Sequence, residues 1–203
     1  MSEEIVERGY DKIAEKYHLA RDRFSHEKEL KEFIKFIPKN GKILDAGCGA
    51  GIPVAKTLSD SGFKVVGIDI SEKMLELAKK HVPHATFIKM DMANVEFKNE
   101  SFDGITAFYS LIHVPKEKHE KIFMDFYSIL KKGGIALLCL GPEEWEATEG
   151  YMGTRMFWSQ HSPEKSLDMI KKAGFEVIWD KTITRGGETH YWILARKERS
   201  ETE

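Results

Sequence analysis

The sequence predicts an α/β fold with a mostly parallel, seven-stranded sheet, helices on both faces of the sheet and an antiparallel last strand. Short β-rich runs alternate with helical runs, which is the pattern of parallel strands joined by helices. The last two β-rich runs are joined by TRGGE, a hairpin loop, so the final strand should run antiparallel. With 203 residues, 41% of them apolar, the chain is long enough for one sizeable core.

Two helices are expected before the first strand, at about 3–18 and 25–37, and we assign residues 1–40 to an N-terminal helical cap. Each expected strand is a short run rich in β-branched, aromatic or other apolar residues. The seven candidates are GKILDAG (41–47), FKVVGID (63–69), ATFIKMD (85–91), FDGITAFY (102–109), GIALLCLG (134–141), FEVIWDKT (175–182) and THYWILARK (189–197).

Polar caps and glycines mark the helices between these strands. Ser71 is placed to cap the helix after the second strand. The helix after the fourth strand is expected to end at Lys131, because Gly133 and Gly134 follow it. Ser162 precedes a proline at the first turn of the last helix, which is the preferred position for proline.

The domain assignment is one unit at 41–198 with an insertion at about 142–161, followed by a tail at 199–203. Lys plus Arg (31) nearly balances Asp plus Glu (33), so extensive contact with nucleic acid is disfavoured. No apolar run approaches the ~20 residues of a membrane span, and the N-terminus has no signal-peptide core. Two cysteines give neither a disulfide framework nor a metal cluster. We therefore expect a cytoplasmic protein without membrane or metal.

A glycine-rich turn follows the first strand in ILDAGCGAG (43–51). Glycines at this density let the backbone come close to a ligand. Asp69, at the end of the second strand, is the second half of a nucleotide-ribose site, where a carboxylate can accept bonds from both ribose hydroxyls. The strand–turn–helix unit is therefore expected to bind a ligand with a free ribose diol.

The turn departs from the dinucleotide pattern GxGxxG, because its third glycine comes one position early and Asp45 precedes it. An acid there would repel a phosphate, whereas it suits a ligand with a positive charge. S-adenosylmethionine fits, because it has a ribose, an amino group, a sulfonium and no phosphate. A dinucleotide site and a bare tight turn are the alternatives.

At this point the sequence resembles the class I S-adenosylmethionine-dependent methyltransferases, whose first motif has the form hhDhGxGxG. Asp91 and Met92 in ATFIKMDM match the family position that meets the adenine, and FDGI (102–105) and LKKGGIALL (130–138) match at the expected spacings. The resemblance covers about residues 40 to 141. It implies a Rossmann-like fold, with S-adenosyl-L-methionine as cofactor and S-adenosyl-L-homocysteine as product.

The N-terminal helix, with Tyr10 and Tyr17 two turns apart, resembles a cap that closes over the methionyl end of the cofactor in the type-11-like small-molecule branch of the family. A packing stripe with Ile13 and Ala14 is the alternative. The residues predicted to bind the cofactor are Tyr10, Tyr17, Asp45, Gly47, Cys48, Gly49, Asp69, Ile70, Met74, Asp91, Met92 and Phe108.

Residues for the methyl acceptor should come from segments that the core fold does not fix. The segment 142–161 has no clear periodicity and is longer than most connections, so we interpret it as a lid with aromatic side chains. A small satellite core is the alternative. The predicted substrate-pocket residues are Tyr109, Trp145, Tyr151, Met156 and Trp158.

Three histidines are candidate bases: His113 after the fourth strand, His161 after the lid segment and His190 on the last strand. A role in orienting other groups is the alternative for His113. The segment TAFYSLIHVP (106–115) has neither the Asn-Pro-Pro-Tyr of base-methylating relatives nor the acidic ligands of metal-dependent ones.

The sequence therefore predicts a methyltransferase that acts on a small molecule. An RNA or protein methyltransferase and a non-catalytic S-adenosylmethionine-binding module are the alternatives. The oligomeric state, monomer or homodimer, is left open.

Overall fold

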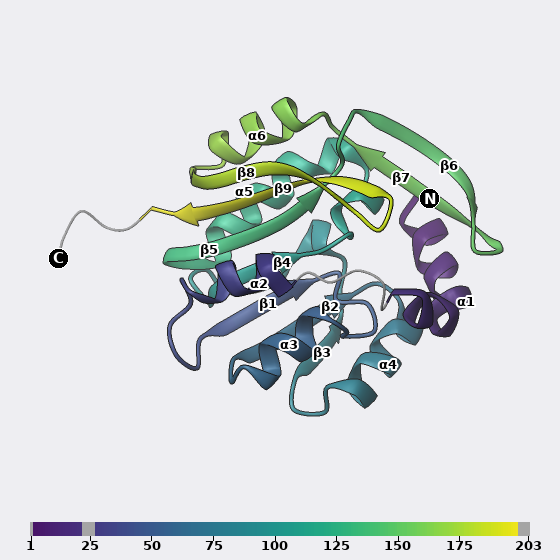
Figure 1. Ribbon diagram of the computed structural model, residues 1–203, viewed down its shortest axis with the longest axis horizontal. Coiled ribbons are helices and arrows are strands. Elements are labelled where there is room, and N and C mark those ends of the chain that lie inside the picture. Colours follow the sequence, from purple (N-terminus) through teal and green to yellow (C-terminus); the bar gives the residue numbers. More distant parts are fainter. Residues whose placement is uncertain (1, 22–26, 199–203) are drawn as a thin grey trace.

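The computed structural model describes residues 2–21 and 27–198 (Figure 1). The predicted tail at 199–203 and the predicted first residues of the second helix, 25 and 26, lie outside the described residues. Seven strands form one sheet in the order β3-β2-β1-β4-β5-β9-β8. The strands of this sheet are β1 (Lys42–Ala46), β2 (Lys64–Asp69), β3 (Thr86–Lys89), β4 (Phe102–Ala107), β5 (Leu130–Leu140), β8 (Phe175–Arg185) and β9 (Glu188–Lys197).

The strand directions agree with the predicted fold class. The strands from β3 to β5 pair in parallel. The last strand, β9, lies between β5 and β8 and runs antiparallel to both. The order reverses at β1, which has β2 on one side and β4 on the other. In open α/β sheets such a reversal places the ligand crevice beyond the carboxyl ends of the strands.

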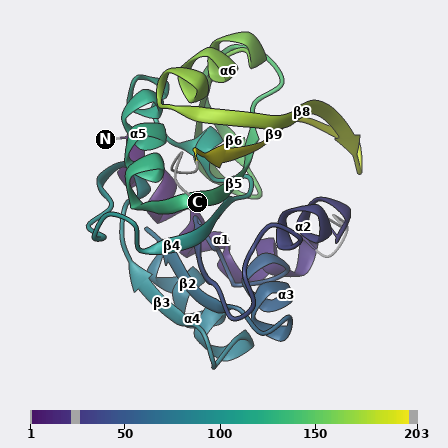
Figure 2. The ribbon, with the colours of Figure 1, turned by 90° about the vertical axis from the view of Figure 1, so that its left-hand side faces the viewer.

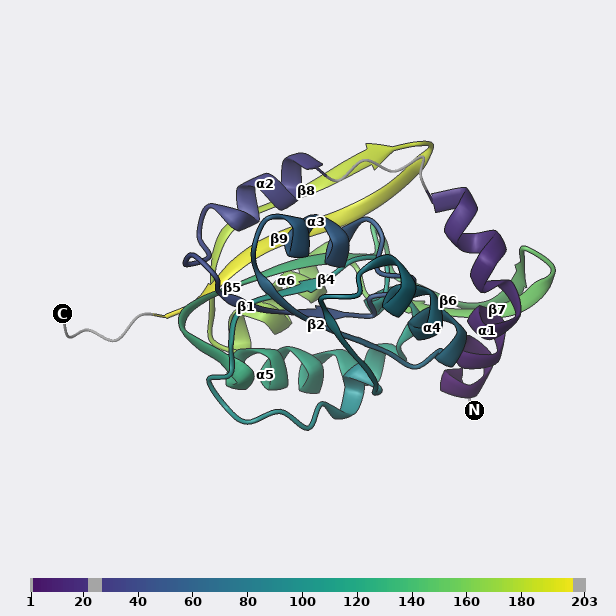
Figure 3. The same cartoon turned by 90° about the horizontal axis from the view of Figure 1, so that it is seen from below.

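Helices cover both faces of the sheet (Figures 2 and 3). The apolar sides of α2 (Glu27–Ile34), α3 (Val54–Asp60) and α4 (Glu72–His81) pack on one face, against side chains such as Ile43 and Leu137. The apolar sides of α5 (His119–Ile129) and α6 (Pro163–Lys172) pack on the other, against side chains such as Leu44 and Leu138. Adjacent strand residues thus face opposite cores, as the two-residue period of a strand requires.

Two of the predicted helix starts are confirmed, and one predicted end is wrong. Ser71 Oγ accepts a hydrogen bond from the Met74 amide, and Ser162 Oγ accepts one from the Lys165 amide. However, α5 ends at Ile129 rather than at Lys131, because Leu130 already pairs with Phe102 in the sheet. The backbone therefore enters the strand before it reaches the glycines.

The segment 142–161, interpreted from the sequence as a lid without clear periodicity, contains a second, two-stranded antiparallel sheet. Its strands are β6 (Trp145–Tyr151) and β7 (Thr154–Gln160). The turn between them places Met152 at φ 50° and Gly153 at φ 92°. Positive φ at both central residues matches the right-handed twist of a hairpin. These two strands were not predicted from the sequence, and the interpretation of the segment as a lid stays a prediction.

The N-terminal helix, α1 (Ser2–Arg21), lies with β6 and β7 at one end of the molecule, at the right in Figure 1. Val6 and Ile13 of α1 are buried against Met156 of β7. Short 3-10 turns, η1 (Met92–Asn94), η2 (Leu111–His113) and η3 (Lys116–Lys118), follow β3 and β4. No helix among the described residues combines the length and apolar composition needed to cross a bilayer.

Candidate functional site

The glycine turn after β1 is held tightly against the neighbouring strands. The amides of Gly47 and Cys48 both donate to the Ile68 carbonyl oxygen, at 2.8 and 2.9 Å. Gly47 has φ 75°, and a Cβ added to it would lie 2.2 Å from the Cβ of Ser110. Both the conformation and the close approach therefore require glycine at this position. Ser110 in turn donates from Oγ to the Ala46 carbonyl at 2.7 Å.

Asp69 braces this turn against the start of α4. One carboxylate oxygen accepts from the Gly49 amide and the other from the Ser71 amide, each at 2.9 Å. Burial raises the pKa of Asp69, and the bonds from Ser71 and Gly49 oppose that rise. A carboxylate has about four lone-pair sites, so two sites remain after these bonds. That capacity fits the predicted contact with a ribose diol.

The Asp45 carboxylate has a hydrogen-bond partner for only one of its two oxygens. It is 1% exposed, and its Oδ1 accepts from the Thr106 hydroxyl at 2.9 Å. Its Oδ2 is buried without a hydrogen-bond partner among the described residues. Burial raises the pKa of Asp45 to about 7, the Thr106 bond lowers it, and the nearby Asp69 charge raises it. A buried carboxylate oxygen without a partner suits a ligand that carries a cation.

Two adjoining cavities open on the glycine turn. The first cavity includes about 670 Å³ of space and the second about 500 Å³, each partly open to solvent. All twelve residues predicted for the cofactor line these cavities. Those on the first are Tyr10, Asp69, Ile70, Met74, Asp91 and Met92, those on the second are Asp45 and Cys48, and those on both are Tyr17, Gly47, Gly49 and Phe108.

Gly49 gives a further test of whether the cavities fit a ligand. Its φ is 51°, and no atom lies within 4 Å of the position that a Cβ would occupy. Because Gly49 lines both cavities, a side chain at this position would project into open space rather than into protein. The turn therefore leaves room for a ligand close to its backbone, and Asp45 fits the cationic end of S-adenosylmethionine. The twelve cofactor contacts stay predictions.

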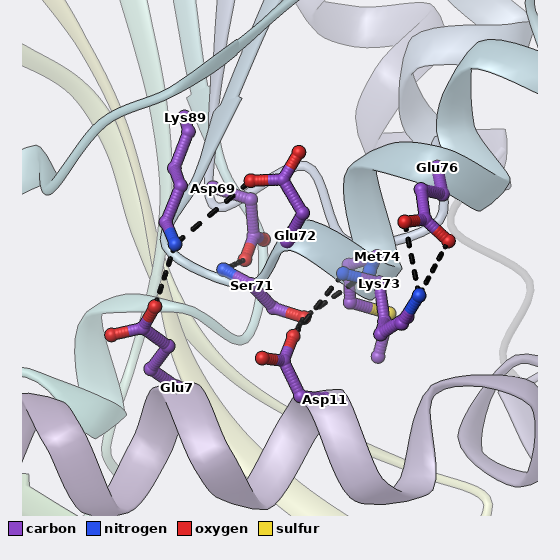
Figure 4. Close-up of polar contacts among 9 residues, drawn as sticks. All are labelled: Glu7, Asp11, Asp69, Ser71, Glu72, Lys73, Met74, Glu76 and Lys89. Carbon is purple, nitrogen blue, oxygen red and sulfur yellow. Dashed lines mark hydrogen bonds and ion pairs between the residues drawn. The ribbon is translucent and has the colours of Figure 1, made fainter.

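The N-terminal helix is fixed along one side of the first cavity by acidic residues at helical spacing. Asp11 accepts from Ser71 Oγ at 2.6 Å and from the Lys73 amide at 3.1 Å, at the start of α4 (Figure 4). Glu7, one turn earlier, pairs with Lys89 of β3 at 2.7 Å (Figure 4). One turn earlier again, Glu3 pairs with Lys118 of η3. These three contacts hold α1 beside the cavity.

His113 joins three separate segments at the first cavity. Its Nδ1 lies 2.7 Å from the Phe157 carbonyl of β7, and its Nε2 lies 2.8 Å from the Tyr10 hydroxyl of α1. A carbonyl oxygen only accepts, so we assign the Nδ1 proton from this bond. In the neutral ring Nε2 then accepts from Tyr10 O–H. Tyr10 also lines the first cavity.

Tyr109 is the one predicted substrate-pocket residue that lines the cavities, and it lines both. It has φ 56°, an uncommon value for a bulky residue, and such residues cluster at functional sites. Its ring stands edge-on to that of His190, with the centroids 4.6 Å apart. His190 therefore supports the site from behind Tyr109 and is not among the described residues that line the cavities. His161 bonds to the Lys116 carbonyl and also lies outside that lining.

The four remaining substrate-pocket candidates pack within the hairpin and against α1. Met156 is fully buried with Val6 and Ile13. The Trp158 ring lies 5.6 Å from Tyr151, 5.8 Å from Trp145 and 5.7 Å from His113. None of the four is among the described residues that line the two cavities. Their packing matches the satellite core that was the alternative, and their role with an acceptor stays a prediction.

Several lining residues were not predicted. Glu3 and Val6 line the first cavity, His18 and Ala50 line the second, and Ser110 lines the first beside Gly47. The glycine motif after β1 predicts only the residues of that turn and the acidic residue Asp69 at the end of β2. The residues on α1 had no sequence signal except their helical spacing from Tyr10 and Tyr17.

Comparison with known proteins agrees with this geometry. A family described as "Methyltransferase domain" matches residues 43–134. The sterol 24-C-methyltransferase of Debaryomyces hansenii is 30% identical over 72% of this chain and 43% of its own length. The chain spans less than two thirds of the length of the first three curated relatives that it matches.

Solved structures establish the fold. A methyltransferase from Methanosarcina mazei superposes with a TM-score of 0.71 and 22% identity, over 82% of this chain and 97% of its own. The 1,6-didemethyltoxoflavin-N1-methyltransferase of Burkholderia thailandensis, solved with S-adenosylhomocysteine, superposes with a TM-score of 0.75 and 15% identity, over 95% of this chain and 87% of its own. A methyltransferase domain therefore spans residues 43–134, and the chain has the fold of the S-adenosylmethionine-dependent methyltransferases, which supports S-adenosylmethionine as its cofactor.

Proposed function

We propose that this protein transfers a methyl group from S-adenosylmethionine to a small-molecule acceptor. The observation that carries the proposal is the three-way junction at His113, where α1, the turn after β4 and β7 meet at the wall of the first cavity. A site walled by these segments fits a small acceptor better than a polymer. The sterol and toxoflavin methyltransferases, by their names, act on small molecules.

The charges around the cavities favour a neutral or cationic acceptor. The charged side chains on the first cavity are Glu3, Asp69 and Asp91, all acids, and Asp45 lines the second. Among the described residues, neither lining includes a lysine or an arginine. The Lys118 contact lowers the pKa of Glu3 to about 2, so this acid stays charged. A phosphate or carboxylate acceptor would meet repulsion from these groups.

The bound cofactor supplies a methyl group on a sulfonium, so an acceptor lone pair forms the new bond to carbon while the carbon–sulfur electrons stay on sulfur. The protein has to align the acceptor and remove its proton. In this proposal the Tyr10 oxygen takes a proton from an acceptor N–H or O–H, while Tyr10 passes its own proton to His113 Nε2, with which it shares a hydrogen bond. Tyr10 is then the catalytic residue, and His113 is a positioning residue that holds the proton.

The test combines binding with methyl transfer. We expect calorimetry to detect S-adenosylhomocysteine binding, and mass spectrometry to detect S-adenosylhomocysteine release with members of a panel of neutral, cationic and anionic small acceptors. Tyr10→Phe should lower kcat at least tenfold with little change in S-adenosylhomocysteine affinity, because the ring remains. His113→Gln should lower kcat, because a glutamine side chain cannot take up the proton.

Tyr127→Phe is the matched control, because Tyr127 packs edge-on against Phe175 and is not among the residues that line the two cavities. It should leave both measurements unchanged. Turnover that requires RNA or a protein substrate would overturn the small-molecule proposal. A Tyr10→Phe enzyme with normal kcat on its best acceptor would overturn the proton route alone.

A further inference from the structure

A buried histidine lies behind the turn that carries His113. His119 is the first residue of α5 and is 1% exposed. Its Nε2 lies 3.1 Å from the Leu111 carbonyl oxygen and 3.0 Å from the Val114 carbonyl oxygen. Carbonyl oxygens only accept, so we assign the ring proton to Nε2, which donates to both. The two carbonyls belong to the residues that flank Ile112 and His113 in the chain.

The second ring nitrogen of His119 makes an apolar filling role a poor explanation. Its Nδ1 is buried and has no hydrogen-bond partner among the described residues. Burial lowers the pKa of His119 to about 4, so the ring is neutral near neutral pH and has one proton, on Nε2. An apolar side chain would avoid the cost of burying an unpartnered nitrogen. The bonds from Nε2, rather than packing alone, therefore account for a histidine at this position.

The turn that His119 contacts is short. η2 is one 3-10 turn, in which the His113 amide donates to the Ser110 carbonyl and the Val114 amide donates to the Leu111 carbonyl, each at 3.1 Å. Hydrogen bonds in 3-10 turns have poorer geometry than those of an α-helix. The side chains of Leu111 and Val114 are buried in the core and fix the depth of the turn. The bonds from His119 add a constraint on the direction of its carbonyls.

The helix on the other side of this contact is firmly anchored. Ile122, Phe123 and Phe126 of α5 are fully buried in the core on this face of the sheet. The centroid of the His119 ring lies 6.1 Å from that of Phe123. His119 thus joins a helix of the main core to the turn at the wall of the first cavity.

We propose that His119 is a positioning residue, whose Nε2–H fixes the backbone of η2 and thereby the direction of the His113 ring. That ring meets two partners at once, the Phe157 carbonyl at Nδ1 and the Tyr10 hydroxyl at Nε2. A rotation of the turn would weaken one contact or both, because hydrogen bonds depend steeply on angle. The effect on turnover rests on the proton route of the proposed function, whereas the effect on the ring does not.

The tautomer of His113 reports the position of its ring without any acceptor. The bond to the Phe157 carbonyl holds the proton on Nδ1. Nitrogen-15 NMR of the full chain distinguishes a protonated Nδ1 from a protonated Nε2. We expect Nδ1–H in the parent protein and a mixture of both tautomers in His119→Phe, which keeps a ring but removes the donor. His119→Leu removes the donor with a smaller side chain and serves if the phenyl ring prevents folding.

Turnover provides the second measurement. His119→Phe should lower kcat by about fivefold to twentyfold on the best acceptor, because the His113 ring is misplaced. The affinity for S-adenosylhomocysteine should change less than about twofold, since His119 is not among the described residues that line either cavity. His119→Gln, whose side-chain amide can donate to the same carbonyls, should recover most of the kcat and the Nδ1–H tautomer.

Phe123→Leu is the matched control, because it disturbs the packing beside the same ring without removing a hydrogen bond. It should lower the melting temperature and leave the His113 tautomer and kcat as in the parent protein. The parent tautomer in His119→Phe or His119→Leu, or an equal loss of Nδ1–H in Phe123→Leu, would overturn the proposal. Loss of Nδ1–H confined to the His119 variants, in a protein that methylates no small acceptor, would support this proposal and overturn the proposed function.

Discussion

Asp45 lies at the glycine turn, and no basic side chain of the described residues forms an ion pair with it. Burial raises its pKa from 3.8 to about 7. A carboxyl group with a raised pKa binds its proton more tightly when folded, so its contribution to stability is fully present below pH 3.8 and is lost as the pH rises to about 7. Asp45→Asn removes this dependence.

We therefore expect the free energy of unfolding of the protein without added cofactor to fall between pH 5 and pH 8 by about 2.5 kcal/mol more than that of Asp45→Asn, at roughly 1.4 kcal/mol per pKa unit. Urea unfolding at the two pH values measures this difference. Asp60→Asn, at an exposed ion pair on α3, is the control and should behave as the parent protein does. If the free energies of unfolding of Asp45→Asn and of the parent protein change in parallel with pH, folding does not raise the pKa of Asp45.

The site residues that lie at the ends of consecutive strands could be predicted from the sequence. Gly47 and Gly49 follow a strand directly, and Asp69 ends the next strand along, so spacing alone places them at one crevice. The contact between Tyr10 and His113 joins residues 103 positions apart. His18 reaches the second cavity only because α1 lies where it does. A single sequence contains no local pattern that fixes the path of that helix over the sheet.

At the scale of elements, the acidic side of α1 sets how firmly the helix closes the first cavity. Asp11 accepts two hydrogen bonds at the N-terminal end of α4, where helix dipoles favour a negative charge. Glu7 makes one ion pair with the half-exposed Lys89, and exposed pairs stabilise by only about 0–1 kcal/mol. Asp11 is therefore the stronger of the two contacts (Figure 4).

We expect Asp11→Asn to raise the dissociation rate of S-adenosylhomocysteine by about threefold to tenfold, and Glu7→Gln to raise it less than threefold. Stopped-flow displacement measures both rates. Glu4→Gln is the control, because Glu4 pairs with Arg8 within α1 and both side chains are largely exposed. Identical dissociation rates in Asp11→Asn and Glu4→Gln would show that α1 does not govern cofactor release.

The hairpin of β6 and β7 is an element that the sequence does not predict. Most of β6 is exposed or half-buried on both faces, so its polar and apolar residues do not alternate as they would on a half-buried strand. Its turn uses Met152-Gly153 instead of an Asn-Gly or Asp-Gly pair. The central strands β2, β1, β4, β5 and β9, in contrast, are mostly buried and carry nearly continuous apolar runs, so they could be predicted with their order along the chain.

At the scale of the whole molecule, an ion pair with a buried carboxylate joins the N-terminal region to the far edge of the sheet. Arg185, at the end of β8, donates to Glu29 of α2 through both terminal nitrogens, at 2.7 and 3.0 Å. The Glu29 side chain is 2% exposed. Figure 3 shows α2 beside β8 at this edge. The next strand, β9, carries His190 to Tyr109, so this edge also borders the site.

Arg185→Met should lower the free energy of unfolding by about 2 kcal/mol or more, because Glu29 would stay buried without its guanidinium partner. The loss should be below the roughly 3–5 kcal/mol of a fully buried pair, since the Arg185 side chain is 31% exposed. Removing both charges in Glu29→Leu/Arg185→Met should recover most of the loss. Lys181→Met breaks the longer pair with Glu32, at 3.6 Å between the same two elements, and should cost less than about 1 kcal/mol. Urea unfolding of the four proteins measures these differences, and an Arg185→Met loss no larger than that of Lys181→Met would mean that α2 is held to the sheet by its apolar side alone.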